Sequence, residues 1–333
     1  MTATTANMPA PNTVRPLQYL PVALFGSAMG LTGLSVAWRL AHARFGLPEA
    51  VSQLIAAAAV AAFVALLAAY GVKTAFAPDA VRAEFRHGVG GQMFGLLVAN
   101  LLLLPIVLAP LSLGLARGLW GLGAVLLAGF LGLMADRSLA ALRQARDAAT
   151  PALVVPAVGL LDLPLAAPAL QLPAPLHDAL VAAWAVGLAL SVPLLAAVLW
   201  RLLRGAPLPA PMLPTLLILV GPAAVGASGH AVLSGGHADG LSISLFAAAL
   251  VLLAVLAARM RGALGLPFKT IWWATSFPLA ATAIASLQVA AAVRSPFTDV
   301  LAAALLAVAT VVIAVLAFLT LRGVVQGRFK EII

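Results

Sequence analysis

Long apolar runs, separated by short clusters of glycine, proline and charged residues, make up most of this 333-residue chain. An α-helix needs about 20 mostly apolar residues to cross the hydrocarbon core of a membrane. Ten runs of this kind predict transmembrane helices over residues 18–41, 50–72, 89–110, 112–135, 151–170, 177–203, 211–233, 240–258, 270–292 and 298–322. The pattern therefore predicts an all-α integral membrane protein, with a ten-helix domain at 18–325 between tails at 1–17 and 326–333.

The composition agrees with a membrane protein and excludes several kinds of site. Hydrophobic residues make up 63% of the chain and charged residues only 9%, whereas a soluble domain has about 25% charged residues. The chain has no cysteine, and its five histidines are widely scattered, so we expect no disulfide, no metal site and no other cofactor. The net charge of +9 is confined to short connections, so we expect no nucleic-acid partner.

The distribution of lysine and arginine predicts the orientation of the chain. An even number of helices places both termini on one side, and 15 of the 19 basic residues lie on that side. The other four are Arg39, Arg44, Arg117 and Arg294. Because cytoplasmic loops are enriched in lysine and arginine, both tails are predicted to be cytoplasmic. The N-terminal tail at 1–17 lacks the apolar core of a secretory signal peptide.

Prolines inside the predicted helices follow the order of the helices along the chain. The odd-numbered helices contain Pro21, Pro105, Pro156, Pro164, Pro214, Pro222 and Pro278, whereas the even-numbered helices contain only Pro193. A proline leaves a backbone carbonyl unpaired, which a membrane helix tolerates where protein or a watery cavity surrounds it. The pattern predicts five hairpins, with the odd helices forming an inner ring around a pore and the even helices an outer layer. The alternative is that the kinks have no role in transport.

Small and polar residues on the odd helices are candidates for the lining of such a pore. Gly26, Gly30, Gly33 and Ala37 share one face of the first helix, which indicates either close helix packing or backbone exposed along a lumen. The candidate pore-lining residues are Gly26, Gly30, Asn100, Asp162, Pro222 and Pro278.

Asp162 is the only ionisable residue deep inside a predicted helix, about eleven residues, or roughly 16 Å, beyond its cytoplasmic start. An acidic side chain at that depth is a candidate functional residue. It is a possible proton-coupling group, and the equally weighted alternative is a structural acid that closes the backbone gap left by Pro164.

Enzymatic chemistry finds no support in the chain. The glycine-rich run at 88–95 has neither a preceding strand nor a following Lys-Ser/Thr, so it does not fit a phosphate-binding loop. No nucleophile stands at a helical spacing from a base and an orienting acid. His230, His237 and Asp239 cluster near the outer end of one helix and are interpreted as polar residues at the level of the lipid headgroups. We therefore expect no enzyme.

Five segments of the chain resemble the tellurite-resistance/dicarboxylate transporter family, which includes bacterial tellurite-resistance proteins, fungal malate permeases and plant slow-type anion channels. They are FGSAMGLTGLSVAW, DAVRAEFRH, TPALVVPAVG, LPTLLILVGPAAVG and IWWATSFPLAATAIAS, and they follow the family order from residue 17 to 325. The resemblance implies a homotrimer in which five hairpins of each protomer enclose a separate pore. It also implies that a phenylalanine closes the pore, and Phe277 occupies the matching position.

These observations predict an anion channel, or a channel-like transporter, that passes small inorganic anions across a bacterial inner membrane and contacts membrane lipid. The alternative is a proton-coupled carrier of four-carbon dicarboxylates such as malate, or of tellurite oxyanions, in which Asp162 titrates. A third hypothesis is a membrane scaffold or sensor whose pore is closed. A passive current without a proton gradient distinguishes the channel from the carrier.

Overall fold

The computed structural model describes residues 17–143, 149–205 and 207–333, and all regular structure in these ranges is helical. The predicted N-terminal tail at 1–17 lies almost wholly outside the described residues. The inner spans combine α-helices with short 3-10 helices, labelled η. They are η1 (Val22–Leu24) with α1 (Phe25–Phe45); α4 (Gly88–Leu103) with α5 (Pro105–Leu108); η2 (Pro151–Val154) with α7 (Val155–Asp162), η3 (Leu163–Ala166) and α8 (Ala167–Leu170); η5 (Ala210–Val220) with α10 (Gly221–Leu233); and η7 (Thr270–Thr275) with α12 (Ser276–Val293).

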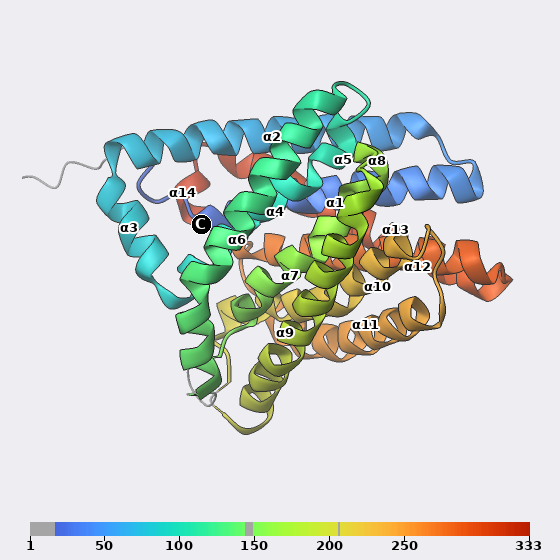
Figure 1. The fold of residues 1–333 in the computed structure, drawn as a ribbon. Helices are drawn as coiled ribbons and strands as arrows, with labels where there is room; N and C mark the ends of the chain where they lie inside the picture. Colours follow the sequence, from blue (N-terminus) through green and yellow to red (C-terminus); the bar gives the residue numbers. More distant parts are fainter. Residues whose placement is uncertain (1–16, 144–148, 206) are drawn as a thin grey trace, which may run out of the picture.

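The outer spans are longer and mostly uninterrupted, and several pass around the outside of the bundle in Figure 1. They are α2 (Glu49–Phe76), α6 (Leu113–Arg143), α9 (His177–Arg204), α11 (Gly240–Arg259) and α13 (Pro296–Val325). Short connecting helices are α3 (Pro78–Arg86), η4 (Ala174–Leu176), η6 (Met260–Ala263) and α14 (Phe329–Ile332). The prediction of an all-α integral membrane protein is confirmed.

Among the described residues, nine helices are long and apolar enough to cross a membrane. The tenth predicted span is α1, which has 21 residues but falls short in hydropathy because it contains glycines, hydroxyl residues and Arg39. Most of α1 is buried against α2 and α12. A helix that other helices surround does not need the uniformly apolar surface of one that faces lipid.

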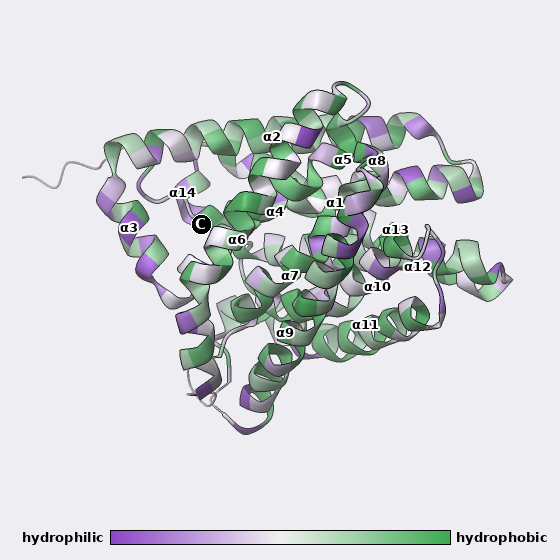
Figure 2. Cartoon of the chain, in the orientation of Figure 1, coloured by the Kyte–Doolittle hydropathy of each residue, from purple (hydrophilic) through white to green (hydrophobic). Residues whose placement is uncertain are grey.

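Burial separates the spans into two layers. In the most apolar 18 residues of each, 67–78% of residues are buried in the inner spans from α4 to α12, against 17–33% in α2, α6, α9, α11 and α13. The outer helices consist mostly of hydrophobic residues, as Figure 2 shows, and many of their large apolar side chains are exposed. Such a surface suits contact with hydrocarbon rather than water. The alternation of inner and outer helices follows the predicted proline pattern.

Three prolines of the inner spans lie where a 3-10 segment passes into an α-helix. Pro222 is the second residue of α10 after η5, and Pro278 is the third residue of α12 after η7. Pro156 has the same place in α7, after η2. The first turn of a helix has no internal acceptor for its N–H groups, so proline loses no hydrogen bond there. Pro193 lies within α9, which continues as one helix.

A buried ion pair ties α3 to the start of the inner ring. Lys73 lies 2.5 Å from an Oε atom of Glu84 and also donates to the carbonyl of Leu20 at 2.6 Å. Glu84 further accepts from the Tyr70 hydroxyl at 2.9 Å and from the backbone N–H of Val22 at 2.6 Å. The Lys73 side chain is only 3% exposed. The connection between the first outer span and the second inner span is therefore fixed to η1.

The predicted C-terminal tail at 326–333 contains α14, which packs at the end of the bundle where the inner spans begin. Nζ of Lys269 donates to the carbonyls of Glu331 and Ile333, at 2.6 and 3.1 Å. The ring of Phe329 meets that of Tyr19 edge-on, with centroids 6.5 Å apart. This tail therefore contacts the residues that precede the first and fifth inner spans.

Candidate pore

Two cavities lie along the axis of the inner ring. The proximal cavity, of about 110 Å³, lies on the side where the inner spans begin, and all five inner spans contribute to it. Its lining is Ala23, Gly26, Met29, Val89, Met93, Leu96, Ala99, Val155, Val158, Asp162, Thr215, Ile218, Gly221, Thr270, Ile271, Trp273, Ala274, Phe277 and Pro278. Apart from Asp162 and two threonines, its wall is almost entirely apolar.

The distal cavity, of about 200 Å³, lies toward the ends of the same five spans. Its lining is Thr32, Gly33, Val36, Arg39, Leu40, Leu103, Ile106, Leu165, Pro168, Ala169, Val225, Ser228, Val232, Phe277, Ala281, Ile284 and Gln288. This wall contains more polar groups than the proximal one, and it includes a guanidinium. The two cavities together follow the inner ring for much of its length.

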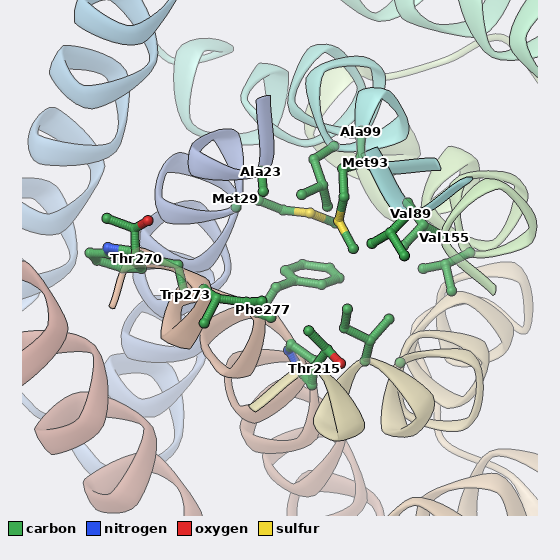
Figure 3. Close-up of a pocket in the computed structure, with 18 of the residues that line it drawn as sticks. Ala23, Met29, Val89, Met93, Ala99, Val155, Thr215, Thr270, Trp273 and Phe277 are labelled. Atoms are coloured by element: carbon green, nitrogen blue, oxygen red, sulfur yellow. The ribbon is translucent and has the colours of Figure 1, made fainter. Parts of the chain in front are cut away.

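Phe277 lines both cavities and lies between them. Figure 3 shows its ring projecting into the space bounded by Met29, Met93, Val155 and Thr215. Only 8% of Phe277 is exposed. The ring therefore stands at the boundary of both cavities.

The position of Phe277 in α12 explains why its ring faces the axis. Hydroxyl residues of α12 point elsewhere, and they donate to backbone carbonyls of their own helix: Thr282 to Pro278 at 2.7 Å and Ser286 to Ala283 at 2.7 Å. On a regular helix these hydroxyls lie opposite Phe277. The face of α12 that carries these hydroxyls is thus turned into the bundle, whereas Phe277 and Gln288 both face the distal cavity.

Asp162 is fully buried at the end of α7 and lines the proximal cavity. Neither of its carboxylate oxygens has a hydrogen-bond partner among the described residues. Burying a polar group without a hydrogen-bond partner is costly. The Asp162 carboxyl group is therefore an exception to the rule that buried polar groups are hydrogen-bonded. It makes no hydrogen bond that would close the backbone gap at Pro164.

Two glycines of α1 that sequence reasoning grouped together have different surroundings. Gly26 lines the proximal cavity, as Pro278 does. Gly30 instead faces Ser276 of α12, and a Cβ atom added there would overlap the Ser276 hydroxyl. Gly30 therefore allows α1 and α12 to pack closely and lies on neither cavity wall.

Asn100 and Pro222 are buried beside the cavities rather than on their walls. The Asn100 amide donates to the carbonyl of Phe25 at 2.9 Å and to that of Leu96 at 2.7 Å. Asn100 thus links α4 to the first inner span. Pro222 is buried in the first turn of α10, and its neighbour Gly221 lines the proximal cavity.

Several lining residues are absent from the candidates that the sequence suggested. Thr215 and Thr270 bring hydroxyls to the proximal cavity, and Arg39, which the sequence assigned only to the side opposite the termini, lies on the distal wall. The position of Thr215 three residues before Ile218, also on the wall, repeats the helical spacing that could have identified it.

The polar cluster near the end of α10 has a structural role. Asp239 caps α11 by accepting from the backbone N–H groups of Leu241 and Ser242 at 3.1 and 3.0 Å. It also lies 3.0 Å from Nε2 of His230, whose ring stacks on Trp184. The backbone N–H of Ser242, and then His230, lower the pKa of Asp239 to about 2. In the part of the chain that the structure describes, no group of three acidic or histidine side chains could hold a metal ion.

Comparisons with known proteins bear on what this ring of helices does. A family model described as SLAC1, voltage-dependent anion channel, matches residues 19–321. The S-type anion channel SLAH3 of Arabidopsis thaliana is 26% identical over 303 residues, which cover 88% of this chain. The same alignment covers 46% of the plant protein, so the chain spans about half the length of this curated relative. The match confirms the family resemblance on which the role of Phe277 was expected.

Proposed function

The chain belongs to the voltage-dependent anion channel family, and we propose that it passes small anions along its inner ring through a pore that Phe277 gates. The observation that carries the proposal is the place of Phe277 on the walls of both cavities. A phenyl ring in an apolar constriction excludes water, and an anion without water has a large desolvation penalty. The gate opens when the ring moves aside and the two cavities join.

The pore of the proposal is complete within one chain. All five inner spans line both cavities, and the outer spans shield them. We propose a homotrimer in which each protomer has its own pore, embedded in lipid in a bacterial inner membrane. The 15 basic residues on the side of the termini favour cytoplasmic tails. The proximal cavity then faces the cytoplasm.

The test of this function is an anion-replacement series on purified protein in planar bilayers. Phe277→Ala is expected to raise the anion current strongly, with a reversal potential that follows the anion gradient when no proton gradient is present. Phe246→Ala is the matched control, because Phe246 is also buried but packs against α12 away from both cavities. A destabilised Phe277→Ala protein that passes no extra current would contradict the gate.

The second candidate function is proton-coupled transport of a dicarboxylate or an oxyanion such as tellurite. The observation that favours it is the buried carboxyl group of Asp162, unpartnered within the described residues and placed on the proximal cavity. A coupled carrier needs a group that gains and loses a proton beside its substrate path. Asp162→Asn should then abolish the pH dependence of uptake into vesicles, while the protein remains folded. Unchanged pH dependence in this variant would exclude the carrier.

A further inference from the structure

The distal cavity contains a guanidinium whose hydrogen-bonding capacity is mostly unused. Nη1 of Arg39 lies 3.5 Å from the carbonyl of Ile106, at the limit of a hydrogen bond. A guanidinium offers five N–H donors, and no other described residue accepts from this one. Arg39 is exposed, so its remaining donors are open to water or to a ligand. Arg39 is also the only basic side chain on either cavity wall among the described residues.

Two further polar groups on the same wall lack partners within the described part of the chain. Ser228 of α10 is 2% exposed, and its hydroxyl makes no hydrogen bond. Oε1 of Gln288 in α12 is buried and also unpartnered. Buried polar side chains are normally satisfied by protein or water. These two buried polar groups share the wall with the open donors of Arg39, which indicates a place for a polar ligand.

The packing of the helices brings these groups to a similar depth. Gly26, Gly30 and Gly33 of α1 face Trp273, Ser276 and Ala280 in turn, so α1 runs in the same direction as the fifth inner span. Gly33 and Ala280 lie at one level. Arg39 follows Gly33 by six residues in α1, and Gln288 follows Ala280 by eight residues in α12. At 1.5 Å per residue these positions are roughly 9 and 12 Å further along the axis.

Ser228 reaches the same region from α10. Its neighbours Ala227 and Ala231 belong to one cluster with Ala285 and Val289 of α12. These α12 residues flank Gln288 in the sequence. The three polar side chains thus come from three helices and share a short section of the distal cavity beyond Phe277.

We propose that Arg39, Ser228 and Gln288 form a binding site in the distal cavity for a small, planar, singly charged anion. The planar fork of the guanidinium matches two oxygens of such an anion, and the Ser228 hydroxyl can donate to it. The Gln288 carboxamide donates through Nε2 once the amide turns its unpartnered Oε1 away from the anion. The rest of the wall is largely apolar, so one positive charge balances one negative charge, and a second would be left uncompensated. The site rests on the proposed function, since it gives the anion a binding position along the conduction path.

Binding is tested first without any current. The melting temperature of the purified protein is measured against sodium formate and sodium chloride, with sodium gluconate keeping the ionic strength constant. Formate should stabilise the protein at lower concentrations than chloride. Arg39→Gln should weaken the apparent formate affinity about tenfold or more, because a charged partner is lost. Arg294→Gln, which removes an exposed charge outside the cavities, should leave it unchanged.

Two further variants keep the test decisive. Arg39→Lys retains the charge but not the fork, so it should lower formate affinity while affecting chloride less. Gln288→Leu removes the amide that another helix contributes, and it should weaken formate binding several-fold. This variant tests the site even if Arg39→Gln does not fold. Formate affinity that equals the wild type in Arg39→Gln or in Gln288→Leu would overturn the site. Tighter binding of the malate dianion than of formate would overturn its preference for a single charge.

Currents separate this site from the proposed function. In a Phe277→Ala background, Arg39→Gln should raise the half-saturating formate concentration on the distal side by the same factor. Current that flows in that background but shows no dependence on Arg39 contradicts the site and leaves the channel intact. Binding that depends on Arg39 without any current in the Phe277→Ala protein contradicts the channel instead.

Discussion

Gly33 of α1 lies directly against the ring of Phe277 in α12: a methyl group built on Gly33 would stand 3.4 Å from Cδ2 of that ring. It would also stand 3.0 Å from Cβ of Ala280. The ring of Phe277 therefore packs beside a residue without a side chain on another inner span. Packing at this point decides how much room the ring has.

We expect Gly33→Ala to lower the basal anion current, because the added methyl group fills space beside the closed ring. The same substitution should have little effect in the Phe277→Ala background, where no ring remains to be held. Bilayer currents of the four proteins form a double-mutant cycle that measures this dependence. Equal effects in both backgrounds would show that Gly33 acts on the pore through another contact.

Substitutions at Phe277 should follow the bulk of the side chain. Phe277→Leu keeps part of the obstruction, so its current should lie between those of the wild type and Phe277→Ala. If Phe277 only packs between helices, truncation to alanine should cost about 3–5 kcal/mol of stability and open nothing. Conductance measured alongside the melting temperature of each variant distinguishes a gate from a packing residue.

The two-layer arrangement can be tested with introduced cysteines, since the chain has none of its own. Cysteines that replace Met29 or Ile284 line a cavity and should react with small aqueous thiol reagents in the Phe277→Ala background. Cysteines that replace Leu127 or Ala309, which are buried in outer helices, should react far more slowly. Equal labelling rates would contradict an aqueous path inside the ring.

The ion pair of Lys73 with Glu84 should contribute to stability where α3 meets the inner ring. Lys73→Met removes one partner of a buried pair, and such changes cost about 3–5 kcal/mol because the remaining charge stays buried. The double variant Lys73→Met/Glu84→Gln leaves no charge behind and should recover part of that loss. Thermal unfolding of the three proteins measures both effects. An unchanged melting temperature in Lys73→Met would show that water reaches Glu84.

Acid should weaken the cap of α11. The folded-state pKa of Asp239 is about 2, below the ordinary value of 3.8. The stabilising effect of its carboxylate is therefore complete above pH 3.8 and is lost as the pH falls toward 2. Asp239→Asn keeps a capping oxygen but does not titrate, so its melting temperature should fall less between pH 5 and 2. Parallel curves for both proteins would contradict this role.

The sequence predicted the layers of the fold well because the property that distinguishes them is carried by individual residues. Prolines such as Pro222 and Pro278 mark breaks that follow the inner spans, whereas Pro193 lies within an uninterrupted outer helix. Long apolar runs likewise identify the outer helices. Only α1 falls below the hydropathy of a membrane span, and its burial explains the difference.

The lining of the pore could be predicted only in part, because it depends on how each helix is rotated about its axis. Gly26 and Gly30 share a face in the sequence, yet one lines a cavity and the other meets Ser276. Nothing in the sequence fixes which end of that face turns to a neighbour. The sequence assigned Arg39 only to the side opposite the termini, because its position beside a cavity depends on how the other inner helices pack around it.

The construction of the inner ring also determines what can change the diameter of the proposed pore. Each hairpin contributes one span to the inner ring, and all five inner spans belong to a single polypeptide. A channel whose bore lies between subunits changes its width when the number of subunits changes. In the proposed channel the bore lies within one polypeptide, so it can be widened or narrowed by mutation but not by a different assembly.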